Sequence, residues 1–600
     1  MKKQTISACI IAKDEEKLIG DCLESIADVA DEMILVDTGS GDGTMALAKQ
    51  YGARIYEYAW DESFANARNR CMEEAKYDWI LFLDADERLY AEDKEKLFAF
   101  LNTRDYDGAH FNIINYVGDG ANYTLHNALR LVRNNGEYRF VGNIHEQISR
   151  KDGVEAAGRF AVLDVRLKHL GYLDWVVADK DKRNRNIPMI LKQLEKDPEN
   201  PFTLFNLGNE YVALHDYEKA NECYQKSMQH FNKAEGYAPH LLFRAAMCLY
   251  NLKRYGQAIA VLNRALLFYP ACTDMEYLKG SIYWEWKRYT LAAGSFEKAI
   301  AMGEAPPELK FSDHCATIRP YYALGKLYAS LHDYQKALEA YTKILEIDNS
   351  YYIILYDIAE ALKELVLNQE EVEKLLRKFV TGDDLPGLLL LCDVFLSIGF
   401  TELSSRYMEK ARQAEGYETE KGYMEGKIAL YLGQYKEAES LLRKACALEE
   451  CKLLPECAPR CKAFLFAAAL LNPEGDPREV VEFIRSHADE LTCRVYAQVC
   501  SVFLAGFEDY LTQAGDVPGQ IKKLEDLLQI FLDIKAYDLF DRLLHTYNYV
   551  DSKQVFISLA GLYLKKGYPQ IAANYIKRSI SELETIDNLG AEILFSAYYY

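Results

Sequence analysis

Residues 79–88 read Trp79-Ile80-Leu81-Phe82-Leu83-Asp84-Ala85-Asp86-Glu87-Arg88. The first five form an apolar run that is too short for a core helix and rich in strand formers, so they predict a buried strand of a mostly parallel sheet. Alternation along a strand puts Asp84 and Asp86 on one side, and the carboxyl end of a parallel strand is where open α/β sheets bind ligands. Two carboxylates there repel each other unless a positive group lies between them, and a magnesium-like cation that also bridges a diphosphate fits that position. The alternative is that these acids cap a helix beginning near Ala91.

The composition narrows the classes of function. The 600 residues, 50% of them hydrophobic, suffice for several packed domains, and a formal net charge of −21 disfavours a nucleic-acid-binding protein. We expect a cytoplasmic protein, because neither a signal peptide nor a membrane-spanning segment is evident. The 14 cysteines include no CxxC pair, which is typical of reduced thiols. One cluster, Cys446, Cys451, Cys457 and Cys461, leaves a zinc site open as an alternative, although its spacing matches no common ligand pattern.

Strands and helices alternate over the first 170 residues. Apolar runs at 6–12, 33–36, 53–59, 109–117 and 160–172 predict further strands, and a helical pattern from Leu18 to Ile26 separates the first two. This alternation predicts a parallel sheet with crossover helices.

A glycine-rich loop follows the second of these strands. Its glycines let backbone amides approach a ligand, and Asp37 at the strand tip could bond a base or a ribose hydroxyl. A tight turn with a helix cap explains the same residues equally well. The spacing is not GxGxxG, so dinucleotide binding is disfavoured. The loop reads Asp37-Thr38-Gly39-Ser40-Gly41-Asp42-Gly43-Thr44.

Three motifs follow one another along the chain: the 37–44 loop, Phe64-Ala65-Asn66-Ala67-Arg68-Asn69, and Asp84-Ala85-Asp86-Glu87. Over residues 5–172 this order resembles the family 2 glycosyltransferases, which have the A-type (GT-A) nucleotide-sugar-binding fold. The resemblance implies a UDP-sugar donor and a Mn²⁺ or Mg²⁺ ion held by Asp86, with Asp84 beside it. It also implies that Asp14 and Asp37 face the nucleoside and that Arg68 lies near the ribose or diphosphate.

A later pair, His145-Glu146, resembles the element that completes the acceptor side in many family 2 enzymes. An inverting sugar transfer requires a base for the acceptor proton while a metal stabilises the departing diphosphate. Glu146 is the candidate base and His145 a candidate metal or diphosphate contact, although the roles could be exchanged or shared with Glu87. Arg130 and Arg133 are weaker candidates for a contact with the diphosphate or the acceptor, because arginines on a strand often face solvent.

From residue 202 a repeating template replaces this alternation. A small residue starts each copy, Ala recurs 12 positions later, and an aromatic or aliphatic residue follows at 16. Starts at 208, 246, 280 and 325 are 38, 34 and 45 residues apart, and one lengthened connection lies at 305–307. The pattern resembles the tetratricopeptide repeat of ~34 residues. It weakens between 353 and 414, is degenerate from 451 to 550, and returns around residue 560.

The predicted organisation is therefore an α/β catalytic domain (1–172) with a GT-A-like, mostly parallel sheet, a helical linker (173–200), tetratricopeptide-like repeats (201–350) and degenerate helical repeats (351–600). We expect an inverting, metal-dependent hexosyl- or N-acetylhexosaminyltransferase. Its acceptor would be a peptide or protein side chain recognised by the repeats. The alternatives are a lipid-linked, core-oligosaccharide or cell-wall acceptor, or an inactive domain that serves as a protein-binding scaffold. The repeats could also mediate homo-oligomer formation.

Overall fold

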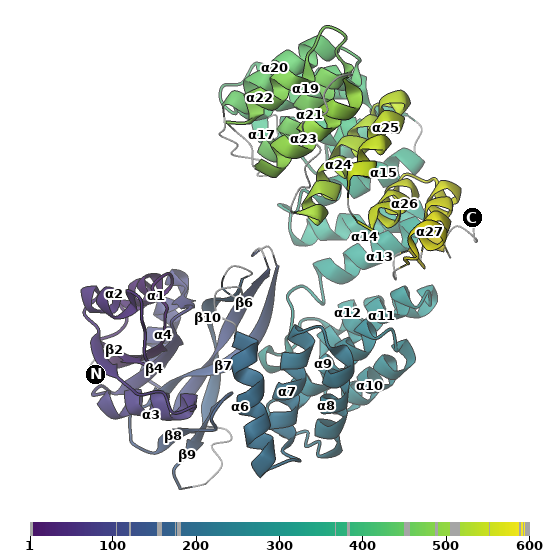
Figure 1. Ribbon diagram of the computed structural model, residues 1–600. Coiled ribbons are helices and arrows are strands. Elements are labelled where there is room, and N and C mark those ends of the chain that lie inside the picture. The colour runs from purple at the N-terminus through teal and green to yellow at the C-terminus, as the bar shows by residue number, and fades with distance from the viewer. Residues whose placement is uncertain are drawn as a thin grey trace. The chain divides into compact units, whose positions relative to one another are not determined.

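The computed structural model (Figure 1) is made of two compact units, a first unit of residues 1–348 and a second unit of residues 349–600. The structure describes residues 4–103, 105–118, 120, 122–152, 159–173, 176, 182–365, 368–380, 384–448, 457–486, 490–504, 516–550, 552–586, 590–591 and 593–594.

The first unit opens with an eight-stranded mixed sheet in the order β3-β2-β1-β4-β7-β6-β10-β5. β1 pairs in parallel with β2 and β4, whereas β7 runs antiparallel to both β4 and β6. The α/β fold predicted from the alternation is therefore confirmed, and each apolar run quoted above overlaps a strand, although the one at 53–59 is a strand only over Arg54–Glu57. The strands are β1 (Ile6–Ala12), β2 (Glu32–Asp37), β3 (Arg54–Glu57), β4 (Trp79–Asp84), β5 (Glu87–Leu89), β6 (Gly108–Gly118), β7 (Asn122–Arg133) and β10 (Phe160–Leu173).

Both faces of the central strands are covered. Helices α1 (Ile19–Ile26), α2 (Thr44–Gln50) and α4 (Lys94–Leu101) lie on one face, and α3 (Phe64–Glu74) lies on the other (Figure 1). Along β4, Leu81 and Leu83 join the core under α1 and α4, whereas Ile80 and Phe82 join the core under α3. Because both faces are buried, a ligand can reach β4 only at its ends.

Two short elements complete this domain, and one of them is a separate two-stranded sheet. A hairpin of β8 (Tyr138–Val141) and β9 (Gln147–Arg150) packs against α3. β5 pairs antiparallel with β10 and leads into a 3₁₀ turn, η1 (Ala91–Asp93). The helix expected near Ala91 thus begins with this turn, whose N-cap position is Tyr90 rather than one of the preceding acids.

The repeat helices of the first unit form antiparallel hairpins. In Gly280 and Gly325, a Cβ atom would lie 2.6 Å from the Phe296 ring and 2.1 Å from the Tyr341 ring on the facing helix. The small residue that starts each template therefore allows the two helices to approach, as the period predicts. The helices are α6 (Lys182–Lys196), α7 (Pro201–Ala213), α8 (Tyr217–Gln229), α9 (Ala238–Asn251), α10 (Tyr255–Phe268), α11 (Thr273–Glu285), α12 (Tyr289–Met302), α13 (Ile318–Ser330) and α14 (Tyr334–Ile347).

A left-handed residue seven positions after each template start makes the turn between the two helices of a hairpin. In the first unit the φ angles of these residues lie between 57° and 59°. They are His215, Lys253, Lys287 and His332.

The second unit continues the same design. Left-handed residues recur at Gly399, Gly433, Lys535 and Gly567, so the turn geometry persists at Lys535, where the sequence pattern is degenerate. Its helices are α15 (Ile354–Leu365), α16 (Gln369–Leu376), α17 (Leu385–Ser397), α18 (Thr401–Arg412), α19 (Glu418–Tyr431), α20 (Tyr435–Ala447), α21 (Cys457–Leu471), α22 (Pro477–Ile484), α23 (Glu490–Phe503), α24 (Val517–Asp533), α25 (Tyr537–Leu544), α26 (Val555–Lys565) and α27 (Pro569–Leu583). Residues 451–456, which include Cys451 of the cysteine cluster, lie outside the described residues. Cys446 and Cys461 of the same cluster are in contact, with their Sγ atoms 3.0 Å apart.

The lengthened connection between α12 and α13, residues 303–317, joins the repeats to the sheet; we call it the connecting segment. It contains the 3₁₀ turn η2 (Pro307–Leu309). On one side the Phe311 ring stacks on Phe243 of α9, with centroids 4.5 Å apart. On the other side the Tyr123 hydroxyl of β7 donates to Asp313 at 2.7 Å. The sheet and the first repeats are thereby held in one body.

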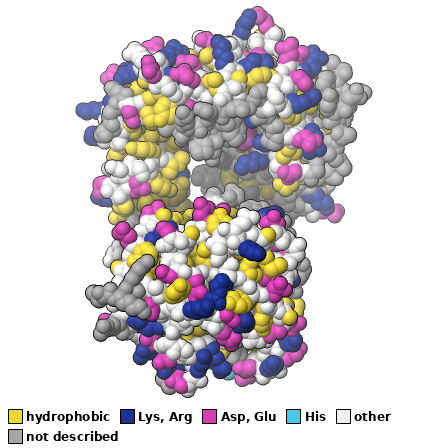
Figure 2. All heavy atoms as spheres, turned by 90° about the vertical axis from the view of Figure 1, so that its left-hand side faces the viewer, with side chains coloured by type: hydrophobic (Ala, Val, Ile, Leu, Met, Phe, Trp, Pro, Cys, Tyr) yellow, Lys and Arg dark blue, Asp and Glu magenta, His cyan; other side chains and the backbone are white. Residues whose placement is uncertain are grey.

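No helix in the part of the chain that the structure describes is both long and apolar enough to cross a bilayer. On the face of the molecule shown in Figure 2, Lys and Arg side chains lie among Asp and Glu side chains.

Candidate active site

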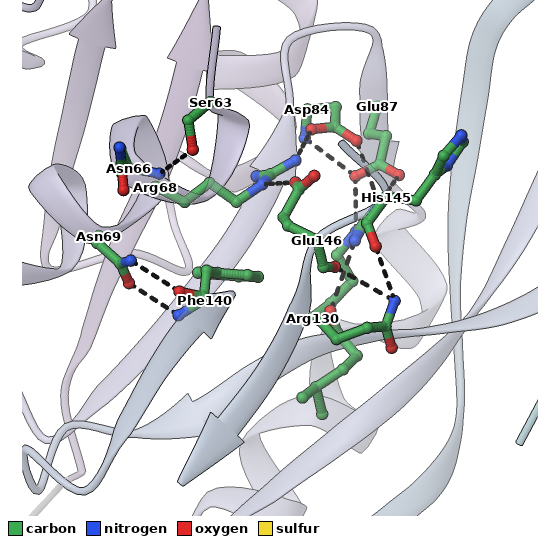
Figure 3. A network of polar contacts seen from close by, with 12 residues as sticks. Ser63, Asn66, Arg68, Asn69, Asp84, Glu87, Arg130, Phe140, His145 and Glu146 are labelled. Carbon is green, nitrogen blue, oxygen red and sulfur yellow. Dashed lines mark hydrogen bonds and ion pairs between the residues drawn. The ribbon is translucent and has the colours of Figure 1, made fainter. Parts of the chain in front are cut away.

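Asp84, at the carboxyl end of β4, contacts two arginines (Figure 3). Arg68 Nη2 lies 2.5 Å from Asp84 Oδ1, and Arg130 Nη2 lies 3.2 Å from Asp84 Oδ2. Burial opposes the charged form of Asp84, but the two guanidinium groups outweigh it and lower the pKa of this carboxyl to about 2. Arg130 also pairs with the buried Glu87, with Nη2 2.7 Å from Oε1. Asp84 is therefore ionised and held through both oxygens.

Arg68 reaches this edge because α3 packs closely on the sheet. Ala65, Ala67 and Cys71 are small residues on its buried face, and Ser63 caps the helix by accepting a hydrogen bond from Asn66 N at 3.3 Å. Arg68 itself is buried. Burial opposes its charge, yet the carboxylates of Asp84 and Glu146 raise the pKa of Arg68 above its usual range. The guanidinium therefore stays charged although little water reaches it.

Glu146 approaches Arg68 from the loop between β8 and β9. Its Oε1 lies 2.5 Å from Arg68 Nε, and its carboxylate points toward Arg68 in Figure 3. Two contacts tie this loop region to α3: Phe64 N donates to the Asn143 carbonyl at 2.8 Å, and the Asn69 amide bonds both backbone groups of Phe140 at 2.9 and 2.8 Å. The structure thus brings together Glu146, Arg68 and Asp84, which the sequence separates widely.

Asp86 faces His169, for which the sequence predicted no role in the site. His169 Nε2 of β10 lies 3.4 Å from Asp86 Oδ1. His169 Nδ1 lies 2.7 Å from Asn115 Oδ1, and Asn115 Nδ2 lies 2.8 Å from His126 Nδ1. Since an amide oxygen only accepts, His169 Nδ1 carries the proton in this pair. Burial opposes the charge of His169, but the Asp86 carboxylate raises its pKa.

Asp86 and His169 fit a divalent cation. A carboxylate oxygen and an imidazole nitrogen suit Mn²⁺-like ions, and a hydrogen bond such as the one to Asn115 commonly orients an imidazole that binds metal. Among the described residues no three His, Cys, Asp or Glu side chains gather as a metal site. A cation held here would therefore complete its shell with oxygens from a ligand or water.

The balance of charge at this edge also favours a cation. The carboxylates outnumber the guanidinium and imidazolium groups even when His169 is protonated, so the edge carries excess negative charge. These groups are Asp84, Asp86, Glu87 and Glu146 on one side and Arg68, Arg130 and His169 on the other.

The glycine-rich loop is shaped by its own acids. Asp37 is 2% exposed and its Oδ2 accepts from Gly39 N at 3.0 Å and Ser40 N at 2.9 Å. Asp14, which has a left-handed φ of 54°, accepts from Gly41 N at 2.7 Å through Oδ1. These are the contacts of a tight turn, the alternative that the sequence left open, and they join the ends of β1 and β2.

His145 and Arg133 lie apart from this cluster. The His145 ring points away from Asp84 in Figure 3, and its Nε2 lies 3.7 Å from Glu210 Oε1 of α7. Arg133 lies opposite Trp79, at the start of β4, with its guanidinium 4.2 Å from the centre of a Trp79 ring. The antiparallel register of β7 thus puts Arg130, but not Arg133, at the carboxyl end of β4.

The sequence did not predict His169 as a site residue, because its contacts depend on the pairing of strands that are far apart in the chain. In the β10–β5 register it lies opposite Glu87, and in the β10–β6 register it lies beside Asn115. β5 is only three residues long and shows no alternation that predicts a strand. The available signal was weaker: a histidine and an asparagine, each inside a long predicted strand.

Fold and site together define an α/β domain with a cluster of charged side chains at the carboxyl end of β4, joined to helical-hairpin repeats. Residues 7–166 match the family described as Glycosyl transferase family 2, and residues 205–271, 276–302 and 318–351 match tetratricopeptide repeat families. The N-terminal domain is thus a family 2 glycosyltransferase domain followed by tetratricopeptide repeats, which confirms the resemblance drawn from the three motifs.

Three curated relatives match between 27% and 46% of the chain. Glycosyltransferase SunS of Bacillus subtilis is 28% identical over 282 residues, which cover 46% of this chain and 66% of SunS. A TPR repeat-containing protein of Synechococcus elongatus is 27% identical, with coverage of 43% and 64%. Lipopolysaccharide core biosynthesis glycosyltransferase LpsC of Rhizobium meliloti is 31% identical over 175 residues, with coverage of 27% and 64%. The chain spans just under two thirds of the length of these relatives.

Among solved structures, a crystal structure of MamA protein has a TM-score of 0.25 at 18% identity and covers 36% of this chain and 97% of that one. Glucosyl-3-phosphoglycerate synthase from Mycobacterium tuberculosis, in complex with Mn²⁺, UDP and glucosyl-3-phosphoglycerate, has a TM-score of 0.17 at 23% identity, with coverage of 18% and 44%.

Proposed function

We propose that this chain is a metal-dependent glycosyltransferase that moves a sugar from a nucleotide-diphosphate donor, a UDP-sugar, to a peptide or protein side chain. The observation that carries the proposal is the convergence of Arg68, Arg130 and Glu146 with Asp84 and Asp86 at one sheet edge, in a domain that matches family 2 glycosyltransferases.

Asp86 and His169 would hold the divalent cation, because Asp84 is already engaged by arginines through both oxygens. Asp84 would orient Arg68 and Arg130 toward the diphosphate of the donor. When bound, the cation would supply charge neutralisation for the leaving diphosphate. Asp14 and Asp37 would serve the nucleoside by fixing the loop whose backbone amides approach it.

Glu146 would act as the base. In the transfer step the acceptor oxygen, nitrogen or sulfur forms a bond to the anomeric carbon, and the bond from that carbon to the diphosphate oxygen breaks with its electron pair. The acceptor proton passes to the Glu146 carboxylate, and the reaction inverts the anomeric centre. Because Arg68 pairs with both Glu146 and Asp84, donor phosphates that attract Arg68 would loosen its hold on Glu146.

The decisive experiment measures release of nucleoside diphosphate from a panel of UDP-, GDP- and TDP-sugars in the presence of Mn²⁺, with water as acceptor. We expect slow hydrolysis of at least one donor, abolished by chelation and by Asp86→Asn. The matched control is Asp105→Asn, an exposed carboxylate of the same domain. Absence of turnover with every donor would instead favour the inactive protein-binding scaffold.

A second candidate acceptor is a lipopolysaccharide core oligosaccharide, which the similarity to LpsC supports. The tetratricopeptide repeats favour a protein acceptor, because such arrays present extended surfaces for peptides. Radiolabelled donor offered together with a peptide library and with core oligosaccharide distinguishes the two, since label should enter only the correct class.

A further inference from the structure

The loop that carries Glu146 is anchored on α6 and on α7, the first helix of the first repeat. Ile144 is buried in an apolar cluster with Met189 and Ile190 of α6 and Leu207 of α7. All three partners follow residue 182, so they lie outside the α/β sheet domain. The rings of Trp60 and Phe64 from the sheet domain also pack against this cluster, so the apolar anchor of the loop is shared between the sheet domain and the α6–α7 pair.

His145 forms a second link to the same repeat. Its φ of 53° is left-handed, a conformation that costs a non-glycine residue energy and persists only where its surroundings impose it. Its Nε2 is shielded from solvent and has no hydrogen-bond partner among the described residues, and Glu210 Oε1 is 3.7 Å away. Glu210 Oε1 itself accepts from Asn186 Nδ2 of α6 at 2.9 Å. The α6–α7 pair thus places a fixed negative charge beside the imidazole.

These links act on three consecutive residues. Ile144 and His145 contact the repeat, while Glu146 contacts Arg68 in the sheet domain at 2.5 Å. A shift of the His145 backbone toward or away from Glu210 would therefore displace the neighbouring residue Glu146. A displacement of ~1 Å at a reacting group costs on the order of 100-fold in rate.

We propose that Glu210 of the first repeat is a positioning residue for Glu146 and acts on it through His145. This inference rests on the proposed function, in which Glu146 is the base. The first repeat is then part of the active site, and its role extends beyond recognition of an acceptor.

Hydrogen exchange of the full-length chain tests the structural half of this inference. Glu210→Gln preserves the shape of the side chain and an oxygen for Asn186 but removes the charge beside His145. We expect the amides of residues 142–147 to exchange about tenfold faster in this variant, because the loop opens more often. Glu222→Gln, an exposed residue of α8, is the matched control and should leave those rates unchanged. Equal exchange in both variants would overturn the proposal.

Donor hydrolysis tests the catalytic half. Glu210→Gln should lower kcat about tenfold and leave KM for the donor within about twofold, because the groups proposed to bind the donor are not altered. Ile144→Ala should act in the same direction by removing the apolar anchor. Wild-type kcat in Glu210→Gln, with Glu146→Gln inactive, would refute the positioning role and leave the proposed function intact. A wild-type chain without turnover would refute the proposed function and this catalytic consequence, whereas the exchange rates alone decide whether Glu210 holds the loop.

Discussion

Asp274 provides a test of how the connecting segment is held. This residue lies in the first turn of α11, is 2% exposed, and accepts hydrogen bonds from Phe311 N at 2.8 Å and Ser312 N at 2.6 Å. Burial raises its pKa from 3.8 to about 6, despite these two bonds. The folded chain therefore keeps the Asp274 proton between these two pH values, while the unfolded chain loses it.

The sign of the effect follows from linkage. Stability from this group is complete below pH 3.8 and is lost as pH rises to about 6. At ~1.4 kcal/mol per pKa unit, the loss amounts to about 3 kcal/mol. Asp274→Asn keeps an oxygen for both amides and never ionises. We expect this variant to match wild type near pH 4 and to be more stable by about 1–3 kcal/mol at pH 7.5.

Urea unfolding followed by tryptophan fluorescence at pH 4, 5, 6 and 7.5 measures this difference. All 5 tryptophans lie within the first 286 residues, so the signal reports the first unit selectively. The pH dependence common to both chains cancels in the comparison. A difference that does not change with pH, or a less stable Asp274→Asn at pH 7.5, would contradict the reasoning.

Three further predictions concern the repeats and the site. Gly325→Ala should destabilise the first unit by about 2 kcal/mol in the fluorescence assay, because its Cβ meets the facing ring, whereas Gly294→Ala on the open face of α12 should stabilise it slightly. Asp86→Asn and His169→Gln should each weaken Mn²⁺ binding at least ~tenfold, measured by electron paramagnetic resonance of free Mn²⁺; unchanged affinity in either variant would exclude that ligand. Arg130→Gln should cost about 3 kcal/mol in the same unfolding assay, because it removes the ion pair of the buried Glu87, and a loss below ~1 kcal/mol would show that water replaces the guanidinium.

The sequence predicted those parts of the fold that depend on local patterns. β1 and β4 follow from apolar runs bounded by polar residues, and the repeats follow from the spacing of small residues that the close approach at Gly280 and Gly325 requires. Contacts between distant segments were less accessible. Glu146 and Arg68 are 78 positions apart, and their pairing depends on a hairpin that packs on α3.

The same limit applies within the site. Arg130 and Arg133 look equivalent in the sequence, and only the antiparallel register of β7 with β4 assigns them to opposite ends of the strand. Asp86 was predicted from its motif, whereas its partner His169 depends on the three-residue β5 and on a neighbouring strand.

The connecting segment restricts how this protein can diversify. It emerges after α12, yet one of its residues must reach Tyr123 of the sheet while another stacks on Phe243 of α9. Insertion or deletion of a hairpin between the sheet domain and this segment would break one of these attachments. A change in repeat number beyond α13 leaves both untouched, so evolution and engineering can vary the length of the array there without disturbing the sheet.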